Sequence, residues 1–155
     1  MSMNVAQSLI VGKMIFLVLL ASFLALPALA LPSAAANQTN FAQTCRRAKL
    51  VDGYYLEAWC LDANGTHPFK NTLDLNFCVG IDYSTSVLQW MVYGKLANYC
   101  SHCSLEHDNP NHPVLDCACQ TSGQKSGIFS TLKLDEGIYN NNGTLTCDGG
   151  IATIG

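Results

Sequence analysis

Charged residues are scarce in this chain of 155 residues. They make up 12% of the sequence, against about 25% in a typical soluble domain, and the net charge is −3. Basic residues form no stripe. Arg46, Arg47 and Lys49 are the one basic cluster, and binding to a phosphate backbone requires more positive charge than they supply. The composition therefore argues against nucleic acid as a partner.

Part of this shortage lies near the start of the chain. Residues 14–30 carry no charge, Lys13 precedes them, and sites of small residues end at Ala30 and Ala36. This order is typical of a secretory signal peptide, and the apolar run is shorter than the ~20 residues of a spanning helix. We therefore predict a signal peptide over residues 1–30, or up to 36, and a secreted, extracellular protein with no membrane contact after cleavage. A retained membrane anchor is the alternative.

Catalytic motifs are missing as well. The sequence has no G-x-S-x-G, no H-E-x-x-H and no phosphate-binding glycine loop. Its eleven acidic residues leave an acid pair for glycoside hydrolysis open, but their spacing gives no sign of one. The sequence predicts a protein that is not an enzyme and uses no cofactor, with a small secreted hydrolase as the least favoured alternative.

The chain contains an internal duplication. Residues 72–76 alternate apolar and polar side chains and recur as residues 131–135, at the same distance after Cys60 as after Cys119. A period of roughly 55 to 59 residues that occurs only twice indicates two-fold pseudosymmetry within one domain, because a solenoid needs about three repeats. We predict one domain over residues 40–148, built from repeats at about 41–90 and 96–147, and a short flexible tail over 149–155.

The local patterns predict an all-β fold. Leu56, Ala58 and Cys60 share one face of an alternating segment, and residues 115–119 repeat this pattern, so we expect these faces to form the core. Long helical periodicity is absent, which allows only short helical turns. Turn-rich segments separate the strands: residues 63–68, 102–113, 121–127 and a tight hairpin at 141–144.

All eight cysteines follow the predicted signal peptide, and an even number in a small secreted domain predicts disulfides. When the two repeats are superposed, Cys45 and Cys60 occupy the same positions as Cys100 and Cys119. Cys103 and Cys117 fall where the first repeat has Ala48 and Ala58. Cys78 and Cys147 remain and pair by elimination. The predicted bridges are Cys45–Cys60, Cys100–Cys119, Cys103–Cys117 and Cys78–Cys147. The minor alternative is a zinc site, because C-x-x-C followed by C-x-C can supply four thiolates; oxidation after export argues against it, so we predict no metal.

Neutral hydrogen-bonding side chains gather at the strand ends and turns. Amides and hydroxyls supply donors and acceptors together, which suits a polyhydroxylated ligand. Such residues also dominate the turns of most proteins, so composition alone favours ordinary turns.

The order of motifs resembles the cyanovirin-N homology family, in particular its fungal members. The resemblance rests on F-x-x-T-C-x-x-x-x-L, L-D-L-N, C-x-x-C-x-L, L-x-C-x-C, L-x-L-D and N-x-x-G-T-L, and covers residues 40–147. It implies two pseudosymmetric, disulfide-stapled halves, each a three-stranded sheet with a hairpin, in which the C-terminal hairpin completes the first half. It also implies a lectin that binds mannose-rich glycans at two distant sites without metal or catalysis.

Carried over by position, the resemblance implies two carbohydrate sites. The first consists of Gln43, Thr44, Asn140, Asn141 and Asn142, and the second of Asn98, Gln120, Thr121, Ser122 and Gln124. Both depart from the family pattern: Leu61, Asp62 and Ala63 replace an acid and a hydroxyl, while Tyr99 replaces a threonine opposite a longer turn at residues 82–86. We expect the first site to be the stronger one.

The expected partners are therefore glycans or glycoproteins. The alternative is a structural or interaction protein that kept the scaffold and lost sugar binding. A hinge at residues 91–95 allows either a monomer or a domain-swapped dimer. Glycosylation motifs at Asn37, Asn64 and Asn142 predict a glycoprotein. We expect Asn142, in the hairpin of the first site, to escape modification because strand pairing by Leu145 and the bridge at Cys147 bury the approach once the chain is folded.

Overall fold

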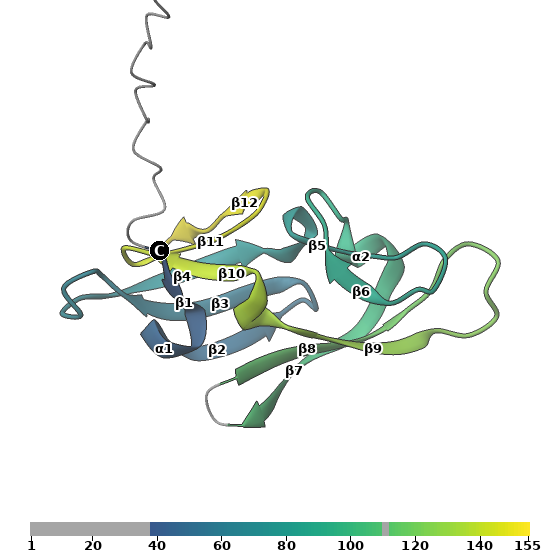
Figure 1. The fold of residues 1–155 in the computed structure, drawn as a ribbon, viewed down its shortest axis with the longest axis horizontal. Helices are drawn as coiled ribbons and strands as arrows, with labels where there is room; N and C mark the ends of the chain where they lie inside the picture. The colour runs from purple at the N-terminus through teal and green to yellow at the C-terminus, as the bar shows by residue number, and fades with distance from the viewer. Residues whose placement is uncertain (1–37, 110–111) are drawn as a thin grey trace, which may run out of the picture. The chain divides into compact units, whose positions relative to one another are not determined.

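Short antiparallel strands make up most of the computed structural model, which describes residues 38–109 and 112–155 (Figure 1). The predicted signal peptide and Asn37 lie outside the described residues. The strands are β1 (Gln38–Asn40), β2 (Cys45–Val51), β3 (Tyr55–Leu61), β4 (Pro68–Asp74), β5 (Val79–Ile81), β6 (Leu88–Trp90), β7 (Cys100–Asn109), β8 (His112–Cys119), β9 (Ile128–Lys133), β10 (Ile138–Asn141), β11 (Thr144–Cys147), β12 (Gly150–Ile151) and β13 (Thr153–Ile154). Single helical turns form α1 (Phe41–Thr44), α2 (Leu96–Tyr99), η2 (Leu75–Phe77) and η3 (Leu134–Glu136). The all-β prediction is confirmed.

The two repeats fold alike. In the first, α1 precedes the antiparallel strands β2, β3 and β4, and η2 follows them; in the second, α2 precedes β7, β8 and β9, and η3 follows. Each repeat also has a register shift just after its first cysteine, with a positive φ at Arg47 (54°) and at His102 (51°). The duplication in the sequence therefore extends to the bulges of the strands.

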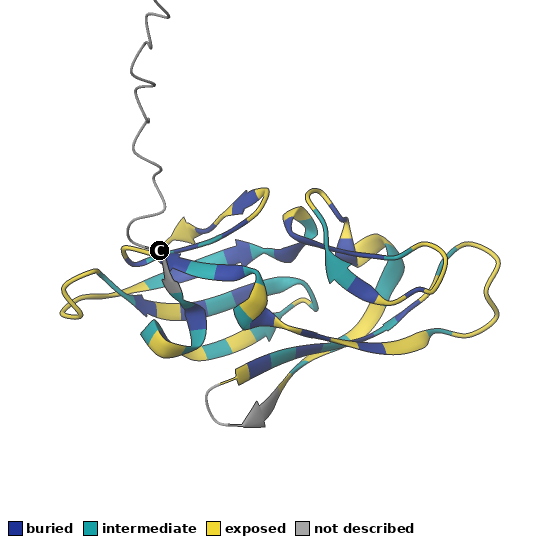
Figure 2. Cartoon of the chain, viewed as in Figure 1, coloured by how far each residue is buried: buried dark blue, intermediate teal, exposed yellow. Residues whose placement is uncertain are grey.

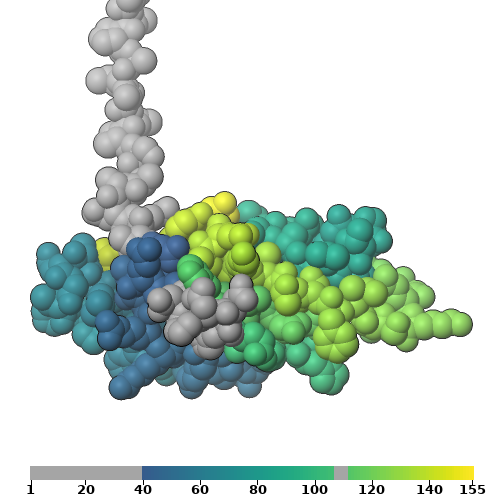
Figure 3. Space-filling model, turned by 60° about the horizontal axis from the view of Figure 1, so that its bottom comes forward, coloured from purple at the N-terminus to yellow at the C-terminus, as the bar shows by residue number. Residues whose placement is uncertain are grey.

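The hairpins are exchanged between the repeats. On β4, Asn71 Nδ2 donates to the Gly143 carbonyl oxygen at 2.8 Å and Asn71 Oδ1 accepts from the Leu145 N–H at 2.9 Å, which attaches the β10–β11 hairpin to the first sheet. At the matching position on β9, Ser130 Oγ accepts from the Leu88 N–H at 2.9 Å and attaches the β5–β6 hairpin to the second sheet. Figure 3 also shows the first described residues beside the segment near residue 140, as the β1–β10 pairing requires.

The core lies on the predicted faces of the central strands. Leu56 and Cys60 on β3, and Leu115 and Cys119 on β8, are fully buried, and buried positions alternate with exposed or intermediate ones along these strands (Figure 2). Because successive side chains of a strand point to opposite faces, this alternation leaves one face of each sheet outside the core.

All four predicted disulfides are present. Cys45 and Cys60 lie directly opposite each other in the β2–β3 pair, and Cys100 and Cys119 do so in the β7–β8 pair, each with Cα atoms 4.0 Å apart. The other two bridges join Cys103 to Cys117 and Cys78 to Cys147, with Cα atoms 4.1 and 5.9 Å apart. The zinc alternative is wrong, because its four thiols are paired with one another.

Two segments differ from the sequence prediction. Residues 149–155, expected to form a flexible tail, contain β12, which pairs with β11, and β13, which pairs with β4. Backbone N–H groups of this segment donate to carbonyl oxygens that the sheet edges would otherwise leave unpaired. For example, the Ala152 N–H donates to the Leu145 carbonyl oxygen at 2.8 Å. The expected turn at residues 102–113 is much shorter, because β7 continues to Asn109 and β8 begins at His112.

The hinge at residues 91–95 is held against η2. The Met91 N–H donates to the Cys78 carbonyl oxygen and the Tyr93 N–H to that of Phe77, both at 2.8 Å. A Cβ atom at Gly94 would collide with the backbone of Val79, so only glycine fits this approach. An exchange of halves between two molecules therefore has to break these contacts.

Removing the Cys103–Cys117 bridge should destabilise the protein less than removing Cys78–Cys147. The first closes a 14-residue loop inside the Cys100–Cys119 loop, while the second joins residues 69 apart and ties the exchanged hairpin to its sheet. A loop of ~15 residues is worth about 3 kcal/mol in the chain-entropy model, and a loop of ~100 about 4.7 kcal/mol. In denaturant unfolding, Cys78→Ala/Cys147→Ala should have the lower midpoint of the two double variants; the opposite order would contradict this assignment.

Candidate glycan site

An open groove lies between α2 and the turn that joins β8 to β9. Its volume is ≈ 420 Å³, and residues 97–101 and 120–124 form its wall. The wall includes the whole second set from the sequence prediction: Asn98, Gln120, Thr121, Ser122 and Gln124. The structure therefore brings together five side chains from two separate segments of the chain.

Hydrogen bonds fix the two walls of this groove. The Gln120 N–H donates to the Tyr99 carbonyl oxygen at 2.8 Å. Gln124 Oε1 accepts from the Thr121 N–H at 3.1 Å and from the Ser86 hydroxyl, a buried group, at 2.7 Å. Ser86 was not predicted as a site residue, although the turn between β5 and β6 occupies the place of the hairpin tip in the other repeat. The turn between β5 and β6 thus holds the Gln124 side chain in place through Ser86.

Tyr99 adds an aromatic surface to the same groove. Its ring packs edge to face on Tyr83, with centroids 5.3 Å apart, and the Tyr83 hydroxyl donates to that of Tyr99 at 3.5 Å. This hydrogen bond raises the pKa of Tyr83. Tyr83 is 56% exposed, and the groove stays open beside Tyr99. The pair therefore presents apolar surface with a polar end next to amides and hydroxyls.

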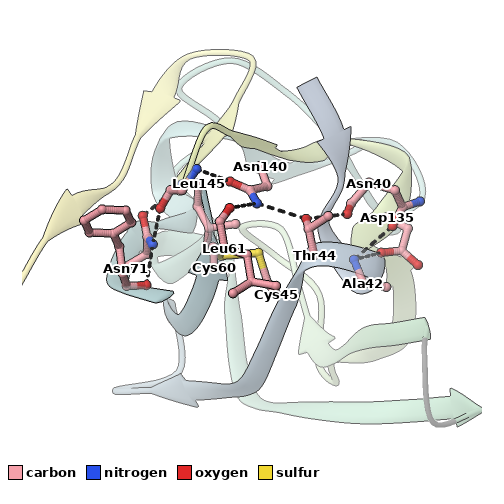
Figure 4. Close-up of a disulfide and its surroundings, with 12 residues drawn as sticks. Asn40, Ala42, Thr44, Cys45, Cys60, Leu61, Asn71, Asp135, Asn140 and Leu145 are labelled. Carbon is pink, nitrogen blue, oxygen red and sulfur yellow. Dashed lines mark hydrogen bonds between the residues drawn. A yellow bond between two sulfur atoms is a disulfide. The ribbon is translucent and has the colours of Figure 1, made fainter. Parts of the chain in front are cut away.

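The first predicted set is divided between the framework and the surface. Asn140 is 2% exposed; its Nδ2 donates to Thr44 Oγ1 at 3.0 Å and to the Leu61 carbonyl oxygen at 2.8 Å, while its Oδ1 accepts from the Gly143 N–H at 2.7 Å (Figure 4). These contacts join α1, the end of β3 and the β10–β11 hairpin at one point, as the resemblance implied. The Asn140 amide is nevertheless engaged within the protein, which differs from the expectation that it faces a ligand.

The tip of this hairpin is tied to the β3–β4 turn. Asn142 Oδ1 accepts from the Ala63 N–H at 2.8 Å. Within the turn, the Asp62 carboxylate accepts from the Thr66 N–H at 2.9 Å and from the His67 N–H at 3.4 Å, and the first of these bonds is the main cause of the lowered pKa of Asp62. Asp62 therefore caps its own turn as a carboxylate.

Gln43, Asn141 and Asn142 are the exposed members of the first set. Gln43 lines a hollow of ≈ 610 Å³ together with Arg46, Arg47 and His112. Three of the five residues are thus exposed. Asn142 is one of them, although its Oδ1 accepts from the Ala63 N–H, while Thr44 and Asn140 are bonded to each other. The Asn140 amide, on which the ranking of the first site partly rested, is used within the protein, and the ranking itself stays a prediction.

Neither a metal cluster nor a membrane-spanning helix is found in the described part of the chain. Within residues 38–109 and 112–155, no group of three or more His, Cys, Asp or Glu side chains is placed to hold a metal ion. No helix in these ranges is long and apolar enough to cross a membrane.

The fold and the groove define a disulfide-stapled β-protein with two exchanged repeats, and the comparisons identify its family. The CVNH domain model matches residues 41–146, so the chain belongs to the CVNH family. The structure is similar to that of GzCVNH from Gibberella zeae, with 25% identity and a TM-score of 0.59 over 69% of this chain and 95% of that one. It is also similar to a MoCVNH3 variant in complex with (N-GlcNAc)4, with 18% identity and a TM-score of 0.57 over 72% and 97%. No curated protein matches the chain.

Replacing Asn140 with alanine should lower stability by about 2–3 kcal/mol, because it leaves the Gly143 N–H and the Leu61 carbonyl oxygen without this partner. The matched control is Asn141→Ala, on the next and exposed position of the same strand, which should stay within ~0.5 kcal/mol of the parent. Thermal and denaturant unfolding of the two variants test this, and equal stabilities would show that Asn140 is not part of the framework.

Proposed function

We propose that the protein is a secreted lectin that binds a neutral glycan in the groove between α2 and the β8–β9 turn. The observation that carries this proposal is the convergence of Asn98, Gln120, Thr121, Ser122 and Gln124 on one open groove in a chain of the CVNH family. Amides and hydroxyls supply donors and acceptors without a charge, which matches the hydroxyl groups of a sugar. They supply no acid–base pair, so we infer binding without catalysis.

Mannose-rich glycans are the ligand class that we propose first, because the resemblance to the family implies them. N-acetylglucosamine oligomers are the second, for two reasons. The MoCVNH3 variant was solved with (N-GlcNAc)4, and the Tyr83–Tyr99 pair offers apolar surface beside the groove that a sugar ring and an acetyl methyl group can cover.

Export is part of the same proposal. Four disulfides join all eight cysteines, and such bridges persist in oxidising compartments. Together with the apolar leader at residues 14–30, they support a secreted, extracellular protein. We propose a monomer as its basic state, because Met91 and Tyr93 hold the hinge against residues 77–78 of the first repeat and the Ala97 N–H of the second repeat donates to Asn76 Oδ1 at 2.8 Å.

A Gln120→Ala variant should bind glycan about five- to tenfold more weakly than the parent, the effect of one hydrogen bond to a neutral partner. Calorimetric titration of the mature protein with a mannose-rich oligosaccharide and with (GlcNAc)4 measures the loss and distinguishes the two ligand classes. The control is Gln89→Ala, on β6 and outside the groove wall, which should bind as the parent does.

Absence of binding to either oligosaccharide would favour the alternative, a structural or interaction protein that has lost sugar binding. Binding that Gln120→Ala leaves unchanged while Gln43→Ala weakens it would move the site to the first repeat.

Glycosylation should be found at Asn64 and not at Asn142. Both asparagines are exposed, but Asn64 lies in the longer β3–β4 turn, whereas the Asn142 side chain is bonded to the Ala63 N–H in a two-residue hairpin turn. Mass spectrometry of the secreted protein before and after glycosidase treatment measures the occupancy of each motif. High occupancy at Asn142 would contradict this proposal and place a covalent glycan on the first site.

A further inference from the structure

An exposed tryptophan lies on the outer face of the first sheet. Trp59 is 40% exposed and stands directly between Arg46 on β2 and Lys70 on β4 in the strand register. Residues directly opposite each other on neighbouring strands have Cβ atoms about 4.5–5.5 Å apart, so both basic side chains start next to the indole ring. None of these three residues is in either of the two predicted sets, although Arg46 also lines the hollow that includes Gln43.

The tryptophan forms part of a hollow. Its volume is ≈ 290 Å³, and it is lined by Arg46, Arg47, Trp59, Leu61 and Pro68. Ligand pockets begin at roughly 300 Å³, so this hollow suits a single small ring. Its lining combines three apolar residues, Trp59, Leu61 and Pro68, with two arginines.

The positive charge in this hollow comes from the arginines. Glu57 accepts from both neighbouring lysines, with Lys49 Nζ at 2.8 Å and Lys70 Nζ at 3.3 Å from its carboxylate oxygens, which offsets their charge. In contrast, neither guanidinium has a hydrogen bond or an ion pair with another described residue. Arg47 also sits on the bulge with φ 54°, which displaces it from the regular strand register.

We propose that this hollow binds an acidic sugar, a uronate residue of a glycan, as an additional subsite of the lectin. The apolar face of a pyranose ring covers the indole of Trp59, and the ring carboxylate reaches the guanidinium groups, whose planar forks match carboxylate geometry. A neutral sugar would stack on the ring but leave the arginines unused. The inference rests on the proposed function, because it extends glycan binding to a new class of sugar.

The same arginines connect this subsite to the first repeat's exposed glutamine. Arg46 and Arg47 also line the hollow of ≈ 610 Å³ that includes Gln43. A chain of several sugar residues that places a uronate between the arginines therefore continues along the surface toward Gln43. This arrangement predicts that acidic oligosaccharides bind better than single uronic acids.

The test compares a tetramer of α-1,4-linked galacturonic acid with the same tetramer after methyl esterification, which removes the charge of each carboxylate and adds one methyl group to it. The mature protein should bind the acidic tetramer about tenfold more tightly, the effect of a hydrogen-bonded ion pair. Trp59→Ala and Arg46→Gln/Arg47→Gln should each remove this preference, while Trp59→Phe should retain part of the binding. Lys49→Gln, which removes a charge from the same strand outside the hollow, should leave the preference intact.

Fold and general lectin activity are checked in the same samples. Every variant is compared with the parent in thermal unfolding and in titration with the neutral (GlcNAc)4 and mannose-rich probes, which should remain unchanged. Equal affinity for the acidic and esterified tetramers, or an acid preference that survives Arg46→Gln/Arg47→Gln, would overturn the uronate subsite while neutral glycan binding stands. Failure to bind any of the four probes would overturn both this inference and the proposed function.

Discussion

The fold depends on a pair of buried polar side chains that hold the exchanged hairpins. Asn71 and Ser130 occupy the same position in the two repeats, both are buried, and each accepts a backbone N–H from the hairpin of the other repeat, that of Leu145 or Leu88. A three-stranded sheet alone would leave its apolar face in water. Because a buried donor or acceptor without a partner is costly, these two contacts fix the register in which each hairpin covers its sheet.

This constraint also decides which residues remain available to a ligand. In the first repeat, Asn140 and Asn142 hold the hairpin to Leu61 and Ala63, so the buried Asn140 amide, which the family resemblance assigns to sugar, is used within the protein, while Asn141 and Asn142 remain exposed. In the second repeat the corresponding turn is longer, and Ser86 supports Gln124 from behind. Asn98 and Gln120 are exposed, and Gln124 is exposed although its Oε1 accepts from Ser86 and from the Thr121 N–H. The two halves of one scaffold therefore offer different surfaces to a ligand.

The sequence predicted the fold well because its signals are local or repeated. Cysteine spacing and strand alternation place Cys45 opposite Cys60 without knowledge of distant contacts. The prediction from sequence failed where a strand forms only against a distant partner. One example is β13, which forms because β4 offers an unpaired edge. The burial of Asn140 could have been predicted, because the alternation of the strand puts it on the same face as the buried Ile138. Its polar amide instead suggested a residue of an exposed turn. Only contacts with Leu61 and Thr44, roughly 80 to 100 residues away, explain why a polar group is buried there.

The duplication gives an internal control for the surface around Trp59. The row of Arg46, Trp59 and Lys70 corresponds in the second repeat to Ser101, Ala118 and Phe129, which occupy the same register. The scaffold therefore folds with or without two cations and an indole at these positions, and the core does not require them. In the second repeat, moreover, the segment after the bulge is tied down by Cys103–Cys117, whereas the first repeat has alanines there. The same backbone forms with either set of side chains on this outer face. The difference between the repeats therefore affects which ligands the first repeat can contact and leaves its fold unchanged.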